Sequence, residues 1–140
     1  MTLRVVVDTN VLVSGLLSVE GSPARVVDLV RGAHVTLLLD GRILHEYRTV
    51  LARPKFQRAI QPAQAEALLA LFSVLGEHVA ARPLNVAQPD PDDVPFLEVA
   101  VAGHADALVT GNLKHFPPTP GLRILGPADF LTYYATLSRD

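Results

Sequence analysis

The chain has 140 residues, of which 49% are hydrophobic and 19% charged, and its formal net charge is -2 at pH 7. This balance predicts a single folded domain over residues 1–140 and excludes both a disordered chain and a polybasic nucleic-acid binder. The sequence has no cysteine, which excludes disulfides, thiolate zinc sites and cysteine nucleophiles, and it shows neither a signal peptide nor a bilayer-spanning apolar run, so we expect a cytoplasmic location.

Apolar β-branched runs predict strands, and segments with good caps and helical spacing predict helices, in alternation along the chain. In chain order, the predicted elements are a strand at Leu3–Val7, helices at Val11–Leu17 and Pro23–Arg31, a strand at Val35–Leu39, helices at Gly41–Ala52 and Ala63–Leu75, a weak strand at Val79–Val86, a loop at Asn85–Asp93, a helix at Asp93–Ala102, strands at Ala107–Val109 and Arg123–Leu125 around a proline-rich loop, and a helix from Pro127 to Leu137. Ser22 and Asp40 are the predicted N-caps of their helices, and Gly32 is the predicted C′ residue of its helix.

This alternation predicts an α/β fold, a three-layer α/β/α sandwich around a mainly parallel sheet. Sheets of this kind bind ligands beyond the carboxyl ends of their strands. The chemistry of this chain is therefore expected from polar residues that directly follow a strand, together with those that neighbouring helices bring to the same edge.

Two acidic residues from separate segments are candidates for such a site. Asp8 directly follows the first predicted strand, and Asn10 is placed to hydrogen-bond its carboxylate and orient it. Glu46 shares a helix face with Ile43 and Val50, and burying a bare carboxylate is costly unless it is paired or holds a metal. The alternatives are that Asp8 only caps the following helix and that Glu46 reaches solvent or pairs with an arginine.

A third acidic group, Asp90, Asp92 and Asp93, precedes a predicted helix. One of the three is expected to cap that helix, but three carboxylates are more than a cap needs, and they repel one another unless a cation neutralises them. Asn112 follows another short strand, where it either holds a water or caps a turn, and Asp106 at the start of that strand is expected to be structural.

These donors suit a hard divalent cation. Carboxylates without thiolates favour Mg²⁺ or Mn²⁺, and one or two such ions can activate water and stabilise the oxygens of an in-line phosphoryl displacement. The five histidines show no metal-ligand spacing, although His115 and Lys114 lie where they could touch phosphate. Glycine-rich phosphate loops and a hydrolase elbow are absent from the sequence. The residues alone lead to the hypothesis of a metal-dependent phosphodiesterase.

Four segments together resemble the motifs of PIN domains. They are VVVDTNVLVS at 5–14, LHEYRTVL at 44–51, DPDDVPFL at 90–97 and GHADALVTGN at 103–112. Their order, spacing and flanking apolar residues match the family across nearly the whole chain. The likeness is nearest to small prokaryotic PIN proteins of the VapC type, which are toxin components of toxin–antitoxin systems.

The resemblance implies an α/β/α sandwich, an endoribonuclease activity that depends on Mg²⁺ or Mn²⁺, a cognate antitoxin partner and a homodimer. Carried over by motif, the implied catalytic residues are Asp8, Glu46, Asp93 and Asn112, the implied metal ligands are Asp8, Glu46 and Asp93 with Asp92 as the alternative third acid, and the supporting residues are Asn10 and Thr110. Candidates for contact with RNA phosphates are Arg48 and Lys114, with Arg53 and Lys55 held as further options.

Asn112 departs from the family pattern, because many relatives have Asp at this position. Losing that charge would weaken a second metal site, so the number of metals stays open. The leading hypothesis is a metal-dependent endoribonuclease that serves as the toxin of a type II toxin–antitoxin pair. The alternative is a weakened PIN module that acts by binding RNA or an antitoxin. A haloacid-dehalogenase-like phosphatase is disfavoured, because its general acid would stand where this chain has Asn10.

Overall fold

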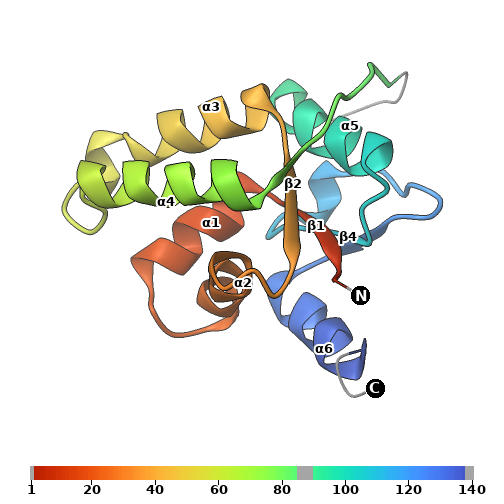
Figure 1. Cartoon of the computed structure of the whole chain (residues 1–140), viewed down its shortest axis with the longest axis horizontal. Helices are drawn as coiled ribbons and strands as arrows, with labels where there is room; N and C mark the ends of the chain where they lie inside the picture. Colours follow the sequence, from red (N-terminus) through yellow and green to blue (C-terminus); the bar gives the residue numbers. More distant parts are fainter. Residues whose placement is uncertain (1, 85–89, 138–140) are drawn as a thin grey trace.

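A parallel sheet forms the centre of the computed structural model, which describes residues 2–84 and 90–137 (Figure 1). Within those residues the sheet has five strands, β1 (Arg4–Val7), β2 (Thr36–Leu39), β3 (Glu77–His78), β4 (Ala107–Val109) and β5 (Arg123–Leu125), in the spatial order β3-β2-β1-β4-β5. All four strand pairs are parallel, so every strand has its carboxyl end at the same edge. The central strand β1 brings its carboxyl end to the middle of that edge.

Helices cover both faces of the sheet, as the sequence predicted. They are α1 (Thr9–Leu17), α2 (Ser22–Arg31), α3 (Gly41–Leu51), α4 (Pro62–Leu75), α5 (Val94–Ala102) and α6 (Pro127–Leu137). Helix α5 packs on β1, β2 and β4 on one side, whereas α1, α2 and α4 lie on the other side, with α3 alongside α4 and α6 against α2 (Figure 1). The predicted α/β/α sandwich is confirmed. No helix in the described part of the chain has both the length and the apolarity needed to cross a membrane.

The core explains why the first strand has no polar break. Val5 and Val6 are fully buried and Val7 is nearly so, because β1 is covered by helices on both faces. Tyr47 of α3 is also fully buried, and its ring centroid lies 6.4 Å from that of Phe72 on α4 and 6.2 Å from that of Phe96 on α5. These aromatic contacts join three helices close to the carboxyl end of β1.

Three sequence predictions about local structure are wrong. Residues 79–84 form no strand; β3 ends at His78, and the N–H of Leu84 donates to the Glu98 carboxylate on α5 instead of to a sheet partner. Gly21, not Ser22, caps α2, and the left-handed residue after this helix is Ala33 (φ 59°), not Gly32. The predicted loop at 85–93 lies partly outside the described residues, and its described end forms a single 3-10 turn at Pro91–Asp93. Asp40 caps α3 as predicted, accepting from the N–H of Ile43.

Candidate metal centre

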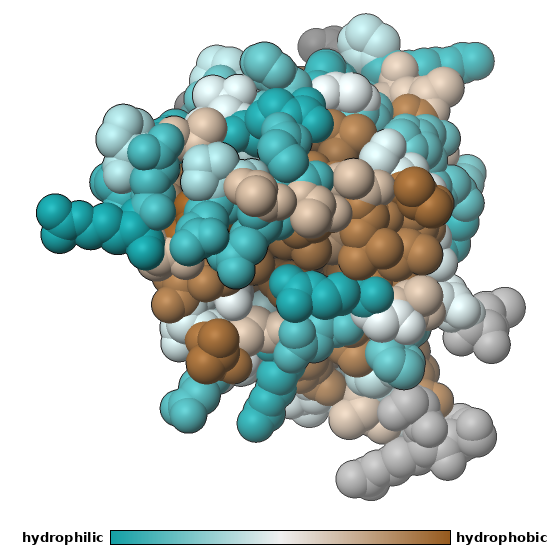
Figure 2. Space-filling view, turned by 60° about the vertical axis from the view of Figure 1, so that its left-hand side comes forward, coloured by the Kyte–Doolittle hydropathy of each residue, from teal (hydrophilic) through white to brown (hydrophobic). Residues whose placement is uncertain are grey.

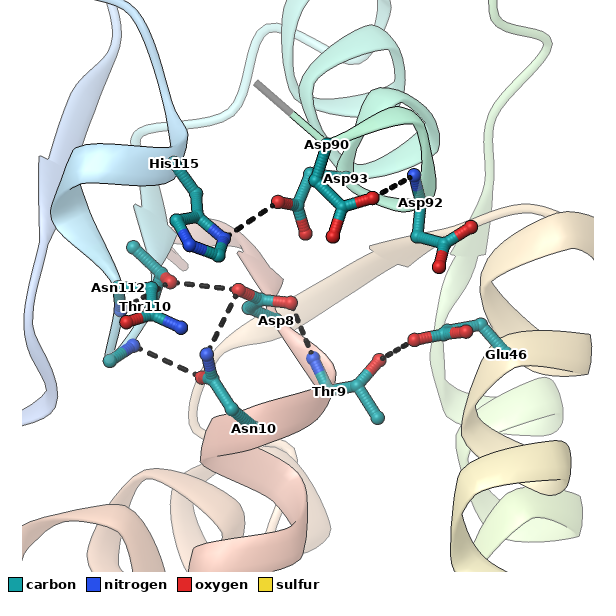
Figure 3. A network of polar contacts seen from close by, with 11 residues as sticks. Asp8, Thr9, Asn10, Glu46, Asp90, Asp92, Asp93, Thr110, Asn112 and His115 are labelled. Carbon is teal, nitrogen blue, oxygen red and sulfur yellow. Dashed lines mark hydrogen bonds and ion pairs between the residues drawn. The ribbon is translucent and has the colours of Figure 1, made fainter. Parts of the chain in front are cut away.

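Asp8 is the central side chain of the site, at the carboxyl end of β1 (Figure 3). It is 5% exposed, and its carboxylate accepts the Thr9 N–H at 2.8 Å, the Thr110 hydroxyl at 2.8 Å and the Asn10 amide at 3.3 Å. Asp8 is also the N-cap of α1, so it caps this helix, as the alternative reading of the sequence expected, and lies at the site as well. Burial raises the pKa of Asp8, and the hydrogen bond from Thr110 opposes that rise. The three neutral donors therefore hold the buried carboxylate of Asp8 in place. They offset only part of the cost of burying its charge.

Glu46 reaches the same place from α3. Its carboxylate accepts the Thr9 hydroxyl at 3.2 Å, and the backbone N–H of the same threonine donates to Asp8. The neighbouring Tyr47 donates its buried hydroxyl to the Val7 carbonyl at 2.6 Å, which fixes α3 against the end of β1. Glu46 is half-buried and has no arginine partner among the described residues. One threonine and one tyrosine thus set the position of Glu46 relative to Asp8.

The third acidic segment enters the site from the turn before α5. Asp93 is 8% exposed and its Oδ2 lies 3.0 Å from Nδ1 of His115, while Asp90 accepts the Asp92 N–H at 2.9 Å. Burial raises the pKa of Asp93, against the effect of the His115 hydrogen bond. Ligand atoms of Asp90, Asp93 and His115 all lie within 4.8 Å of one another. In Figure 3 the carboxylates of Asp90 and Asp93 point to the space beside Asp8.

These segments enclose one cleft of about 350 Å³, which we call the carboxylate cleft. Among the described residues, the carboxylates that line it are Asp8, Glu46, Asp90, Asp92 and Asp93, and the other polar side chains of the lining are Thr9, Asn10, Ser14, Arg53, Asn112 and His115. A larger hollow of about 520 Å³ between α1, α2 and α4 lies on the face seen in Figure 2, where brown apolar surface is prominent. Its lining contains no carboxylate in the described part of the chain, in contrast to the carboxylate cleft.

The donor set of the carboxylate cleft fits a divalent cation. Asp8 and Asp93 are buried carboxylates from different segments that open into one space, and neither is hydrogen-bonded to a lysine or arginine among the described residues. Carboxylate and amide oxygens with one imidazole are ligands that suit Mg²⁺ or Mn²⁺. A bound cation would lower the repulsion that the protein alone leaves between these two groups.

The structure brings most of the expected site residues together. Asp8, Glu46, Asp93, Asp92, Asn10 and Asn112 line the carboxylate cleft, and Thr110 donates to Asp8. Asn112 is exposed, and its N–H donates to the Thr110 hydroxyl at 3.0 Å. Asp106 accepts the N–H of Arg4 at the opposite edge of the sheet, as expected for a structural residue.

Two expected residues lie elsewhere. Arg48 pairs with Glu66 of α4 at 2.8 Å, and Lys114 is exposed on the short turn Leu113–His115; neither lines the carboxylate cleft. Contact of Arg48 or Lys114 with RNA stays a prediction.

Sequence reasoning gave no metal-binding or supporting role to three further residues of the site, although it named Asp90 within the third acidic group and His115 as a candidate phosphate contact. Thr9 bridges Asp8 and Glu46, Asp90 lines the cleft, and His115 contacts Asp93. Thr9 could have been found from the sequence, because it follows Asp8 at the end of the first strand and begins the next helix. The contact between Asp93 and His115 spans 22 positions and leaves no spacing signal.

Comparisons with known proteins give two findings and one negative result. A family model described as PIN domain matches residues 4–114. A chain from the crystal structure of VapBC2 from Rickettsia felis, bound to a DNA fragment from their promoter, is similar in fold, with a TM-score of 0.55, 18% identity and coverage of 87% of this chain and 97% of that chain. Among curated proteins, none matches this sequence.

Proposed function

Because this chain belongs to the PIN domain family, as its four motifs predicted, we propose that it is a metal-dependent endoribonuclease that hydrolyses phosphodiester bonds of RNA. PIN domains are generally nucleases, and the acidic cluster required for such chemistry is present. One observation carries the proposal: the buried carboxylates of Asp8 and Asp93 open into one cleft without a lysine or arginine hydrogen-bonded to either in the described chain. Structural acids are usually paired where they are buried.

In this proposal, Asp8, Glu46 and Asp93 hold Mg²⁺ or Mn²⁺. When bound, the ion supplies Lewis-acid chemistry that lowers the pKa of water and stabilises developing charge on phosphate oxygens. We choose Asp93 over Asp92 as the third acid, because Asp93 is buried and held by His115 whereas Asp92 is exposed.

The chain's own residues fix the geometry that such a reaction needs. Thr110 and Asn10 orient the carboxylate of Asp8, and Thr9 orients that of Glu46. Glu46 is half-buried and lines the cleft. In this proposal, its carboxylate oxygens also orient the attacking water. Asn112 lines the same cleft with a neutral amide, which offers an oxygen or a donor but no charge.

The biological setting is part of the same proposal. The similar fold in VapBC2 and the VapC-like motifs support a role as the toxin of a type II toxin–antitoxin pair, with a cognate antitoxin, a homodimer and a cytoplasmic location. A second candidate is a PIN module that binds RNA or an antitoxin without cleaving. It is favoured by one observation, the neutral Asn112 at a position where relatives often carry a charge.

Cleavage of labelled single-stranded RNA of mixed sequence tests the activity. We expect Mn²⁺-dependent cleavage by the native chain, no cleavage in EDTA, and a loss of at least about a hundredfold in Asp8→Asn. Glu66→Gln is the matched control, because it removes one carboxylate charge from an exposed pair outside the cleft and should cleave normally. RNA binding without cleavage in Mn²⁺ or Mg²⁺ would favour the binding module, and absence of both binding and cleavage would refute the proposal.

A further inference from the structure

One wall of the carboxylate cleft is neither acidic nor amide-bearing. It is formed by Arg53, which follows α3, and Phe56, in the 3-10 turn Pro54–Phe56, and we call it the Arg53–Phe56 wall. Both side chains line the same cleft as Asp8 and Glu46. This wall places a guanidinium and an aromatic ring next to the group of carboxylates.

The guanidinium of Arg53 is free to take a ligand. Its side chain is exposed and makes no hydrogen bond or ion pair with any described residue. By contrast, two arginines of α3 have partners, because Arg48 pairs with Glu66 and Arg42 pairs with Asp40 and Glu98. Arg42 and Arg48 are therefore held in ion pairs within the protein, whereas the guanidinium of Arg53, which lines the cleft, has no such partner among the described residues.

Local sequence explains the position of Arg53. Pro54 cannot continue α3, and Arg53 adopts extended backbone geometry (φ -60°, ψ 136°) as the N-cap of the following turn. The chain therefore leaves the direction of α3 at Arg53, and Arg53 and Phe56 line the cleft. Its N–H still donates to the Val50 carbonyl at 3.1 Å, which anchors the backbone at this point.

Phe56 supplies an apolar surface beside that charge. Its ring is half-buried, packs against the hydrophobic core and also lines the cleft. Nζ of Lys55 lies 5.0 Å from the ring centroid, so a second positive charge lies beside Phe56, although Lys55 itself does not line the cleft. Basic side chains next to an aromatic ring that lines a cleft are a combination that binds single-stranded nucleic acid, through phosphate contacts and base stacking.

The opposite side of the cleft has a different character. A hollow of about 250 Å³ shares Asn10, Ser14 and Asn112 with the carboxylate cleft and is otherwise lined by groups such as Pro23 and Pro127. No charged side chain of the described chain lines this hollow. Attraction for a phosphate therefore comes from the Arg53–Phe56 wall and not from this side.

From this geometry we propose that the Arg53–Phe56 wall binds single-stranded RNA next to the reacting phosphodiester, with Arg53 on a flanking phosphate and Phe56 stacked on a base. The inference rests on the proposed ribonuclease function and assigns the residues that hold its substrate. It selects Arg53 from the four cations that the sequence left open. Both residues bind substrate and leave the carboxylates to hold the metal.

Equilibrium binding of a short fluorescein-labelled single-stranded RNA tests this assignment. Binding is followed by fluorescence anisotropy, with Ca²⁺ in place of Mn²⁺ to keep the strand intact, which a gel verifies. We expect Arg53→Ala to weaken binding about tenfold and to reduce the slope of log K against log salt by about 0.7, because one phosphate contact is lost. Arg31→Ala is the matched control, because it removes an exposed guanidinium that lines the apolar hollow and not the carboxylate cleft, and it should change neither affinity nor slope.

Phe56→Leu tests the stacking half of the proposal. Leucine keeps the apolar contact with the core but removes the aromatic face, so we expect about tenfold weaker binding with an unchanged salt slope. Circular dichroism melting identifies a misfolded variant, in which case Arg53→Ala decides the proposal alone. Calorimetric Mn²⁺ affinity should be native in both variants.

Two negative outcomes are distinguishable. If the native chain cleaves RNA while Arg53→Ala and Arg31→Ala both bind it as tightly as the native chain, the wall assignment is overturned and the ribonuclease function stands. If the native chain neither binds nor cleaves RNA, both proposals fail together.

Discussion

The two edges of the parallel sheet carry acidic side chains in contrasting surroundings. At the amino edge, Arg4 donates its backbone N–H to Asp106 at 2.8 Å, and its guanidinium donates to Glu77 at 2.7 Å and to the Gly103 carbonyl at 2.7 Å. At the carboxyl edge, Asp8 and Asp93 are more deeply buried, yet their hydrogen-bond partners are hydroxyl, amide and imidazole groups. The better buried acids are thus the ones without an arginine.

A fifth carboxylate, Glu98, shows that this chain can pair a buried acid with an arginine. Glu98 on α5 is 6% exposed, and Arg42 donates to it at 2.7 Å while the Leu84 N–H donates at 2.9 Å. Glu98 and Asp8 are almost equally buried and lie in the same domain. The difference in partners, an arginine for Glu98 and only neutral donors for Asp8, is the basis of the proposal that a cation from solution binds at the carboxyl edge.

The largest expected effect is stabilisation of the carboxyl edge by metal. At a Mn²⁺ concentration about a hundred times its dissociation constant, binding should add about 2.7 kcal/mol to the free energy of unfolding, which raises Tm by about 8 °C. Asp8→Asn should show no such rise, because it removes the central ligand. Differential scanning calorimetry with and without Mn²⁺ measures the Tm of both proteins. An equal rise in Tm in the native chain and in Asp8→Asn would show that the metal does not bind at Asp8.

The next effect concerns the neutralised acid. Arg42→Met keeps the aliphatic stem but leaves Glu98 buried without its cation, so we expect a loss of about 2 kcal/mol in the free energy of unfolding, less than for a fully buried pair because Arg42 is half exposed. Urea unfolding measures this loss. The control Arg48→Met breaks the exposed pair with Glu66 and should cost less than about 0.5 kcal/mol. If Arg42→Met and Arg48→Met lowered the free energy of unfolding equally, burial of Glu98 would not make its ion pair more important than the exposed one.

A smaller effect is expected where Tyr47 joins the two ligand-bearing segments. Tyr47→Phe preserves the contacts with Phe72 and Phe96 but leaves the buried Val7 carbonyl without its donor, at a cost of about 1 kcal/mol. Because α3 then loses its tie to the end of β1, we expect Mn²⁺ affinity to fall about tenfold. Urea unfolding and calorimetric titration measure the two quantities. Native Mn²⁺ affinity would assign this hydroxyl to stability alone.

The smallest effect is a pH dependence of opposite sign at the two edges of the metal-free protein. Burial raises the pKa of Asp8 and Asp93, so their contribution to stability is complete below the unfolded pKa and is lost as pH rises through the folded pKa. The hydrogen bond from Arg4 lowers the pKa of Glu77, so its contribution is present above the unfolded pKa and is lost as pH falls through the folded pKa.

Melting in EDTA at pH values between the acidic range and neutrality separates these two contributions. Asp8→Asn should reduce the gain in stability seen on acidification. Glu77→Gln should lower stability at neutral pH by less than about 1 kcal/mol and leave that gain in place. A native pH profile in Asp8→Asn would contradict the assigned cause.

Sequence reasoning predicted the fold well because its local signals agree with the tertiary structure. The apolar run at β1, Asp40 before α3 and Pro62 at the start of α4 each specify an element through burial or backbone chemistry. The strand predicted at 79–86 is wrong within its described residues because the backbone of Leu84 finds its partner in Glu98, which lies 14 positions away. A side-chain acceptor at that distance leaves no periodic pattern.

The site was predictable to the extent that its residues end strands or belong to recognised motifs. Asp8 and Glu46 carried such signals, whereas the contact of His115 with Asp93 depends on how a loop returns to the cleft. The free state of Arg53 was equally hidden, because only the structure shows that Arg48 has a partner and Arg53 lacks one among the described residues. Pairing between distant charges is what the linear sequence could not supply.

Calorimetric titration of the metal-free chain with Mn²⁺ tests the central claim most directly, with Asp8→Asn and Glu98→Gln compared side by side. The two substitutions each remove one carboxylate charge of almost equal burial, one at the carboxyl edge and one in the pair with Arg42. We predict that the native chain and Glu98→Gln bind Mn²⁺ with the same affinity and that Asp8→Asn loses binding. Unchanged Mn²⁺ affinity in Asp8→Asn would contradict the account.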